Sequence, residues 1–201
     1  MITTILSALC TVFFLAVPPA FAGKKDNAIA RLNYAGLRKK GHCTAVLISK
    51  NKALTARHCV ENWPRKDLRL VFGYARGEWV ELRKIRIIHS HKSQDLAVLC
   101  LSKRSRQKPI GVALNFQIKR VQNAKITGYP RSRPHLPVSK TCALQKGGTR
   151  ARFECPLEPG MSGSPVMMTI KGKRMVVGIA SKTSRAFSII ERTNNLPKGG
   201  C

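Results

Sequence analysis

Short apolar runs, either alternating with polar residues or rich in β-branched residues, follow one another along the chain from Cys43 onward. Turn residues separate these runs, and no long helical periodicity lies between them, which is typical of a protein built from many short strands. The pattern predicts an all-β sandwich or barrel. The expected strands lie at residues 43–48, 53–56, 68–73, 79–89, 96–101, 124–128, 138–144, 164–170 and 174–181.

One segment interrupts this pattern near the middle of the chain. Residues 103–122 carry the densest charge, including the stretch "KRSRQK", and few strand signals. Clustered charge without apolar alternation favours a connection over a core element. We therefore expect this segment to be the linker between two halves of the protein.

The first 22 residues form a single apolar run that ends in the small-residue pattern Ala20-Phe21-Ala22. This length and ending are typical of a signal peptide, and we expect cleavage after Ala22. No second apolar run approaches the roughly 20 residues needed to span a bilayer. The sequence thus predicts a secreted or periplasmic protein that starts at Gly23 and has no transmembrane segment after cleavage.

The cysteine content fits an exported protein. Without Cys10, which lies in the signal peptide, six cysteines remain. An even number in an exported chain predicts three disulfides, although six cysteines allow 15 different connectivities. The six are Cys43, Cys59, Cys100, Cys142, Cys155 and Cys201.

The chain is strongly basic, with 37 Lys and Arg residues against 9 Asp and Glu residues and a formal net charge of +28. Such a charge favours non-specific contact with polyanions at low salt, and it also keeps a solvated surface soluble. The basic residues are spread along the chain and are not interleaved with aromatic residues as in a single-strand binding groove. We therefore expect no dedicated nucleic-acid partner.

The stretch "EPGMSGSPV", residues 158–166, places Ser162 among glycines and prolines. Alone, this composition is typical of a turn. A nucleophilic serine also needs a base within hydrogen-bond reach and a group that orients the base. His58 in "ALTARHCV" and Asp95 in "HKSQDLAVLCL" supply these residue types, each at the end of an expected strand.

The three contexts together resemble the chymotrypsin-like serine proteases. "TARHC", "DLAVL" and "GMSGSPV" are similar to the family motifs around its histidine, aspartate and serine, in the same chain order. The last motif and "TGYP" at residues 127–130 resemble most the bacterial branch that includes the glutamyl endopeptidases. The resemblance runs from about Gly41 to Ser181. It implies two antiparallel β-barrels within residues 23–201, at about 30–105 and 120–190, with the active site in the cleft between them.

The resemblance also implies a secreted serine endopeptidase that hydrolyses polypeptides through an acyl-enzyme. Ser162 would be the nucleophile, His58 the general acid and base, and Asp95 the group that fixes the tautomer of His58. The backbone N–H groups of Gly160 and Ser162 would form the oxyanion hole. No cofactor is expected, and we expect a monomer. The alternative is a non-catalytic, cationic protease homologue that binds anionic surfaces or polymers.

The resemblance matches Cys43 and Cys59 to the family disulfide beneath the catalytic histidine. Cys142 and Cys155 are expected to pair across the strands that lead into the serine loop, which leaves Cys100 for Cys201. A competing interpretation is a zinc site built from His42, Cys43, His58 and Cys59. Adjacent His-Cys pairs cannot both point at one ion without strain, and export favours disulfides, so we expect no metal.

Substrate specificity departs from both familiar patterns. Pro156 stands where the trypsin branch has a pocket aspartate, and Leu157 and Ala180 stand where the glutamyl endopeptidases have threonine and histidine. The pocket is therefore expected to take small or medium apolar side chains, although Glu158 or Lys182 could recruit a charged one. The expected pocket residues are Pro156, Leu157, Glu158, Ala180, Ser181 and Lys182.

Activation also departs from the trypsin branch. Residue 161 is Met, where that branch has an aspartate that receives the new N-terminal ammonium. Such a switch cannot operate with Met161.

Overall fold

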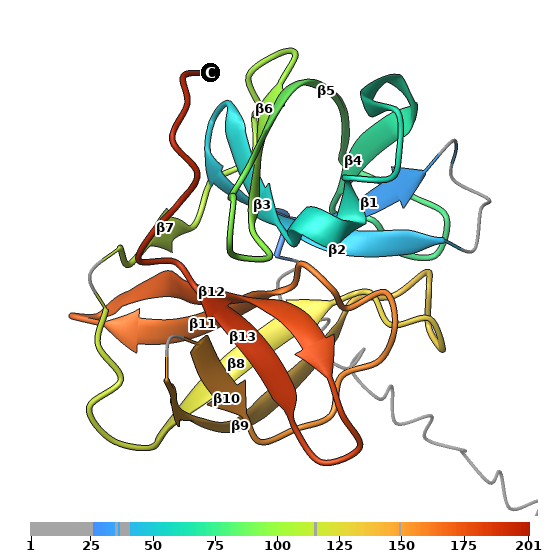
Figure 1. Ribbon diagram of the computed structural model, residues 1–201. Helices are drawn as coiled ribbons and strands as arrows, with labels where there is room; N and C mark the ends of the chain where they lie inside the picture. Colours follow the sequence, from blue (N-terminus) through green and yellow to red (C-terminus); the bar gives the residue numbers. More distant parts are fainter. Residues whose placement is uncertain (1–25, 35, 37–40, 115, 149) are drawn as a thin grey trace, which may run out of the picture.

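The computed structural model describes residues 26–34, 36, 41–114, 116–148 and 150–201, and it contains two antiparallel β-barrels stacked on each other (Figure 1). The expected signal peptide lies outside the described residues. Across the described ranges, none of the helices has the length and apolar character that crossing a bilayer requires.

The first barrel closes on itself through pairing of its first and fourth strands. A short 3₁₀ turn, η1 (Arg57–Cys59), follows its third strand, and a second, η2 (Arg65–Asp67), precedes its fourth. In spatial order the strands are β1 (Ile29–Tyr34), β2 (His42–Ser49), β3 (Lys52–Thr55), β6 (Ala97–Leu101), β5 (Glu81–Ser90) and β4 (Leu68–Phe72).

The second barrel is closed by pairing of β11 with both β8 and β12. Together with the first barrel it confirms the predicted all-β, two-barrel fold class. In spatial order its strands are β11 (Pro165–Ile170), β8 (Gln122–Gly128), β9 (Val138–Gly147), β10 (Arg150–Phe153), β13 (Ser188–Arg192) and β12 (Lys173–Thr183).

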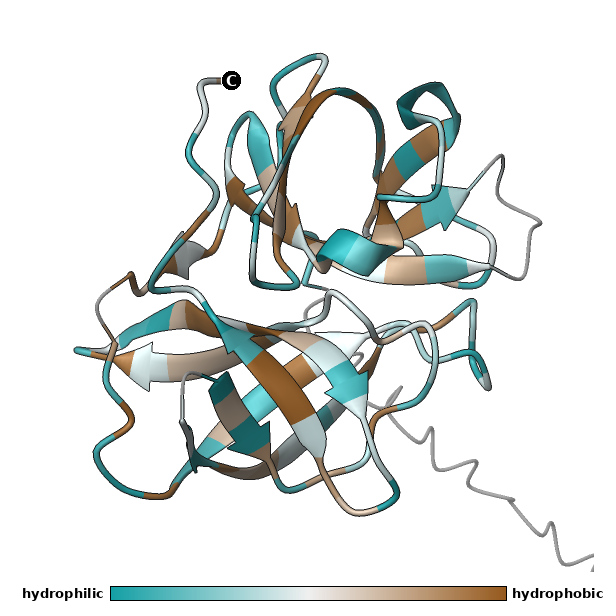
Figure 2. Cartoon of the chain, in the orientation of Figure 1, coloured by the Kyte–Doolittle hydropathy of each residue, from teal (hydrophilic) through white to brown (hydrophobic). Residues whose placement is uncertain are grey.

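Each barrel has its own apolar core. The first is filled mainly by leucines, valines and alanines, and the second is centred on Ile126, Phe153, Met161 and Ile190. Apolar and polar bands alternate along several strands (Figure 2). In β10 the two arginines are exposed while Ala151 and Phe153 are buried. This period of two buries one face of the strand and solvates the other.

The segment between the barrels is packed more tightly than a charged linker would be. Ser105 and Ile110 within it are buried. The two-residue strand β7 (Gly111–Val112) pairs in parallel with β12. The segment connects the two barrels, as expected for a linker. Part of it is packed, because Ile110 joins the core of the first barrel and Ile118 the core of the second.

Three disulfides cross-link the fold, and they join the pairs expected from the sequence: Cys43–Cys59, Cys100–Cys201 and Cys142–Cys155. The second one ties the end of the chain to β6, so that the C-terminus lies beside the first barrel (Figure 1). After β13 the chain therefore leaves the second barrel and ends beside the first.

Candidate active site

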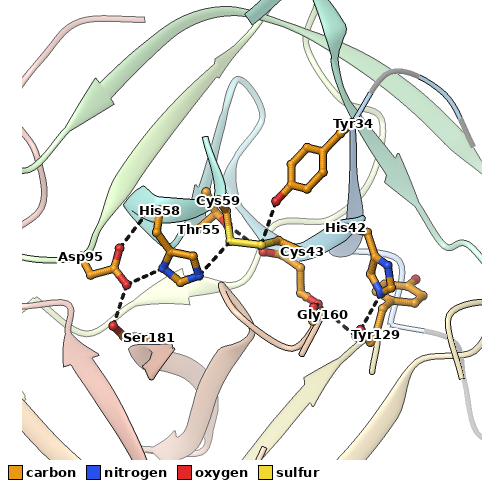
Figure 3. Close-up of a disulfide and its surroundings, with 11 residues drawn as sticks. Tyr34, His42, Cys43, Thr55, His58, Cys59, Asp95, Tyr129, Gly160 and Ser181 are labelled. Atoms are coloured by element: carbon orange, nitrogen blue, oxygen red, sulfur yellow. Dashed lines mark hydrogen bonds and ion pairs between the residues drawn. A yellow bond between two sulfur atoms is a disulfide. The ribbon is translucent and has the colours of Figure 1, made fainter. Parts of the chain in front are cut away.

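His58 and Asp95 meet at the edge of the first barrel. His58 lies in η1, directly after β3, and Asp95 lies two residues before β6, which pairs with β3. Asp95 Oδ2 is 2.7 Å from His58 Nδ1, and Asp95 Oδ1 accepts the backbone N–H of His58 at 2.9 Å (Figure 3). This double contact fixes the ring and places the proton of a neutral imidazole on Nδ1, which leaves Nε2 as an acceptor.

The Asp95 carboxylate has a further donor that the sequence did not reveal. Ser181 Oγ, on β12 of the second barrel, donates to Asp95 Oδ2 at 2.6 Å (Figure 3). Burial alone would raise the pKa of Asp95, but the hydrogen bonds from His58 and Ser181 outweigh it and hold this pKa well below its usual range. Asp95 is therefore an ionised carboxylate that can stabilise a charged His58.

The loop that carries Ser162 depends on two glycines with positive φ. Gly160 has φ 91° and Gly163 has φ 82°, a region that other residues rarely adopt. Gly163 also has no room for a side chain, because a Cβ would lie 2.1 Å from the Thr44 carbonyl oxygen and 2.2 Å from Thr55 Oγ1. The loop therefore passes directly over β2 and β3, the strands that lead to His58.

Backbone hydrogen bonds fix this loop to both barrels. The Ser162 carbonyl accepts from Thr44 N–H at 2.8 Å, and Gly163 N–H donates to the Ala180 carbonyl at 2.8 Å. Ala180 directly precedes Ser181, which binds Asp95. Ser162 is thus held between the strand that leads toward His58 and the strand that supports Asp95.

The Ser162 hydroxyl makes no hydrogen bond to any described residue, and His58 Nε2 lies 3.7 Å from Cys59 Sγ. The structure therefore joins His58 to Asp95 by a hydrogen bond and places Ser162 on the adjoining loop without a direct bond to His58. The N–H groups of Gly160 and Ser162 likewise have no acceptor among the described residues, and they remain available to an external oxygen.

A second histidine lies beneath Gly160. His42 is buried, and its Nε2 is 2.8 Å from the Tyr129 carbonyl oxygen. A Cβ on Gly160 would meet both the Tyr129 oxygen and His42 Nε2 at about 2.6 Å or less. Thr44 Oγ1 completes this support by donating to the Gly160 carbonyl at 3.0 Å. Figure 3 shows His42 and Tyr129 beside Gly160, across the Cys43–Cys59 disulfide from Asp95.

A pocket of about 420 Å³ opens beside His58 and Asp95. Six of its lining residues are basic or are members of the hydrogen-bonded group already described. Ser181 and Lys182, both expected in a substrate pocket, line it, but the Ser181 hydroxyl is engaged by Asp95. The lining also includes Arg57, Glu61 and Arg150.

The remaining expected pocket residues are not among those that line this pocket. The side chains of Leu157 and Ala180 are buried in the core of the second barrel. Pro156 is exposed and its carbonyl accepts from Lys140 Nζ, while Glu158 is half-buried and its carbonyl accepts the N–H of Met161. Of these four residues, two therefore belong to the core and do not face a substrate.

Met161 itself is fully buried in the second core. An apolar side chain at this position offers an N-terminal ammonium no counter-charge. This agrees with the expectation that the trypsin-type switch cannot operate.

The cluster considered as a zinc site is engaged otherwise. Cys43, His58 and Cys59 place potential ligand atoms within 4.8 Å of one another, but the two sulfurs are bonded to each other. A disulfide supplies no thiolate to a metal. The fourth expected ligand, His42, is hydrogen-bonded to the Tyr129 carbonyl.

Comparison with known proteins assigns this arrangement to a class. Residues 43–179, more than half of the chain, match the protein family described as a trypsin-like peptidase domain. Among solved structures, the chain is similar to a thermostable serine protease, AL20, from an extremophilic microorganism. The two share 14% sequence identity with a TM-score of 0.69, over 84% of this chain and 92% of the other. None of the curated proteins shows significant similarity to the sequence.

Proposed function

The chain belongs to the trypsin-like peptidase domain family, and from this premise we propose that it is an exported serine endopeptidase that works through Ser162, His58 and Asp95. The observation that carries the proposal is the pair of hydrogen bonds between His58 and Asp95, together with the backbone hydrogen bonds that fix the Ser162 loop to both barrels. The expected place in the glutamyl-endopeptidase branch stays a prediction.

In the proposed reaction the Ser162 hydroxyl attacks the scissile carbonyl carbon. His58 Nε2 takes the hydroxyl proton as the bond forms, and the resulting imidazolium is stabilised by the ionised Asp95. His58 then returns this proton to the leaving amine, so that an acyl-enzyme remains on Ser162. Water, deprotonated by His58, attacks the acyl carbon and restores the free serine.

The negative charge on the substrate oxygen needs donors that are already in place. The unpartnered N–H groups of Gly160 and Ser162 support this role, because the Gly160 turn is held from below by Thr44, Tyr129 and His42. Pre-positioned donors of this kind typically contribute 10²- to 10³-fold to the rate, roughly, for each one. The loop geometry therefore supports an oxyanion hole at this position.

Export and substrate preference are part of the same proposal. Three disulfides support an oxidising compartment, in agreement with the expected signal peptide. A primary pocket for small or medium apolar side chains stays a prediction from the sequence, since Leu157 and Ala180 are buried in the core of the second barrel. The proposed substrate is a polypeptide, and a monomer without cofactor or metal suffices for this chemistry.

The alternative, a non-catalytic cationic homologue, has less support. Its motivation is the net charge of +28. A chain that served only as a cationic binder would not need a histidine ring fixed by a carboxylate with three donors. Polyanion contact remains compatible with an active enzyme as a non-specific, salt-sensitive effect.

Hydrolysis of denatured casein tests the proposal. The wild-type protein should release peptides, while Ser162→Ala and His58→Ala should each lower the rate by about 10³-fold or more. Ser49→Ala is a matched control, because the Ser49 hydroxyl binds Asn51 in the first barrel and lies outside the site. Equal hydrolysis by wild type and Ser162→Ala would refute the assignment.

A further inference from the structure

The pocket beside His58 is lined by more cationic than anionic side chains. Its lining includes the cations Arg57, Arg150 and Lys182 and the anions Glu61 and Asp95. Whether it attracts a charged ligand depends on which of these charges are already paired within the protein.

Both anions are engaged. Asp95 accepts three hydrogen bonds from His58 and Ser181. Glu61 forms an ion pair with Arg57, Nε to Oε2, at 3.4 Å. Arg57 also donates through Nη1 to two backbone carbonyls, at 3.1 Å each, in the loop before Asp95. The pocket therefore has no carboxylate left to receive an incoming cation.

Arg150 is held by an acid outside this pocket. Its Nε lies 2.7 Å from Glu191 Oε1, and the Glu191 side chain is only 1% exposed. Holding a buried carboxylate costs free energy unless a cation stays beside it, so Glu191 fixes Arg150 at the rim. Arg150 also lines an adjoining pocket of about 520 Å³ that includes Arg192. The basic surface therefore continues from one pocket to the next.

Lys182 is the cation without a partner. It is exposed, and no acidic side chain among the described residues pairs with it. It follows Ser181 directly on β12, so its backbone is tied to the strand that supports Asp95. An unpaired ammonium here faces the same pocket as His58, the base of the proposed reaction.

We propose that this pocket is a subsite for an acidic side chain of the substrate, near the scissile bond, and that Lys182 is its specificity-determining residue. The inference rests on the proposed endopeptidase function and names a substrate class for it: peptides with Asp or Glu close to the cleavage site. This subsite is separate from the primary pocket that the sequence predicts for small or medium apolar side chains. A nucleic acid fits less well, because the pocket lining includes no aromatic side chain on which a base could stack.

The size of the effect follows from the exposure of Lys182. One exposed ion pair changes a rate ratio by about two- to five-fold, and reversing the charge doubles the logarithm of that change. We expect Asp and Glu to be enriched by about three- to five-fold at one position near the cleaved bond. The Lys182→Gln variant should lose most of the enrichment, and Lys182→Glu should select Lys or Arg at that position.

Cleavage-site profiling on a proteome-derived peptide library, read by mass spectrometry, tests the proposal. Lys119→Glu is the matched control, because it makes the same charge change on an exposed residue that does not line the pocket. Raising NaCl from about 0.05 to 0.5 M should reduce the wild-type enrichment, since a contact between exposed charges is screened. This second measurement does not depend on any variant.

The outcomes separate the subsite from the function beneath it. Acidic enrichment that is lost in Lys182→Gln and kept in Lys119→Glu supports the subsite. Wild-type cleavage without acidic enrichment, or with enrichment unchanged in Lys182→Glu, overturns the subsite and leaves the endopeptidase standing. A wild-type protein that cleaves no peptide and reacts with no serine-directed probe overturns the endopeptidase, and the subsite with it.

Discussion

Removing the Ser181 hydroxyl should weaken the site without touching Ser162 or His58. In the Ser181→Ala variant Asp95 loses its 2.6 Å hydrogen bond, while both bonds from His58 remain. The Asp95 side chain is 11% exposed, so little water can replace the lost donor. A hydrogen bond to a buried charged group contributes about 1.5–3 kcal/mol, and we expect the free energy of unfolding at pH 7 to fall by this amount.

The loss should depend on pH in a direction that the structure fixes. The folded-state pKa of Asp95 is lowered, so its stabilising contribution is present above the unfolded value and is lost as the pH falls through the folded value. Ser181→Ala raises the folded pKa toward the unfolded value of about 3.9. The difference between wild type and variant should therefore be constant near neutrality and shrink only once the pH falls to the folded-state pKa of the variant, which lies below about 3.9.

The same substitution should slow the chemistry. The hydrogen bond from Ser181 helps to hold the Asp95 carboxylate in position, and Asp95 stabilises the imidazolium that forms when Ser162 reacts. A loss of about 1.4 kcal/mol in this stabilisation would slow reaction with a fluorophosphonate by about ten-fold. Urea unfolding between pH 3 and pH 8 and the labelling rate at pH 8 measure the two effects.

Ser49→Ala serves as the reference, because its hydroxyl donates to the Asn51 side chain at 2.9 Å and not to a carboxylate. Its effect should be smaller and independent of pH over the same range. A Ser181→Ala variant that is destabilised no more than Ser49→Ala at pH 7 would refute this prediction.

Three further predictions concern the scaffold. Gly163→Ala places a methyl group against the Thr44 carbonyl and should abolish labelling of Ser162. Circular dichroism of the same variant shows whether the loss comes from a displaced loop or from an unfolded protein. Glu81→Gln leaves Arg83 without its partner and should cost about 3 kcal/mol at pH 7 in urea unfolding. Because the pKa of Glu81 is lowered despite its burial, that cost should shrink below about pH 4. Replacing Cys100 and Cys201 by Ala opens a disulfide across a separation of 101 residues and should cost roughly 2–5 kcal/mol by the same assay.

The fold class could be predicted because nine of the described strands are marked in the sequence by apolar alternation or β-branched runs. Four of the described strands, β1, β7, β10 and β13, were not predicted. In β1 all six residues are buried, including Arg31, whose Nε donates to the Pro134 carbonyl 103 positions away. In β13 the buried Glu191 pairs with Arg150 of β10. Buried charges satisfied by distant partners break the alternation that marks a strand, and β7 is only two residues long.

The candidate site was visible only where its chemistry lies within short stretches of sequence. His58, Asp95 and Ser162 each stand in a contiguous motif. Ser181 was expected as a pocket residue, but its bond to Asp95 could not be predicted, because the two are 86 positions apart and nothing local distinguishes Ser181 from other strand serines. The support of Gly160 by His42 has the same origin, since it depends on the packing of the two barrels against each other.

Labelling with a fluorophosphonate, followed by mass-spectrometric mapping of the adduct, tests the central claim most directly. The account predicts one phosphonylated residue, Ser162, in the wild-type protein, and no adduct in Ser162→Ala. His58→Ala should label at least 10³-fold more slowly, roughly, because no base remains to take the proton. A wild-type protein that stays unlabelled under conditions where trypsin reacts fully, or an adduct on a different residue, would contradict it.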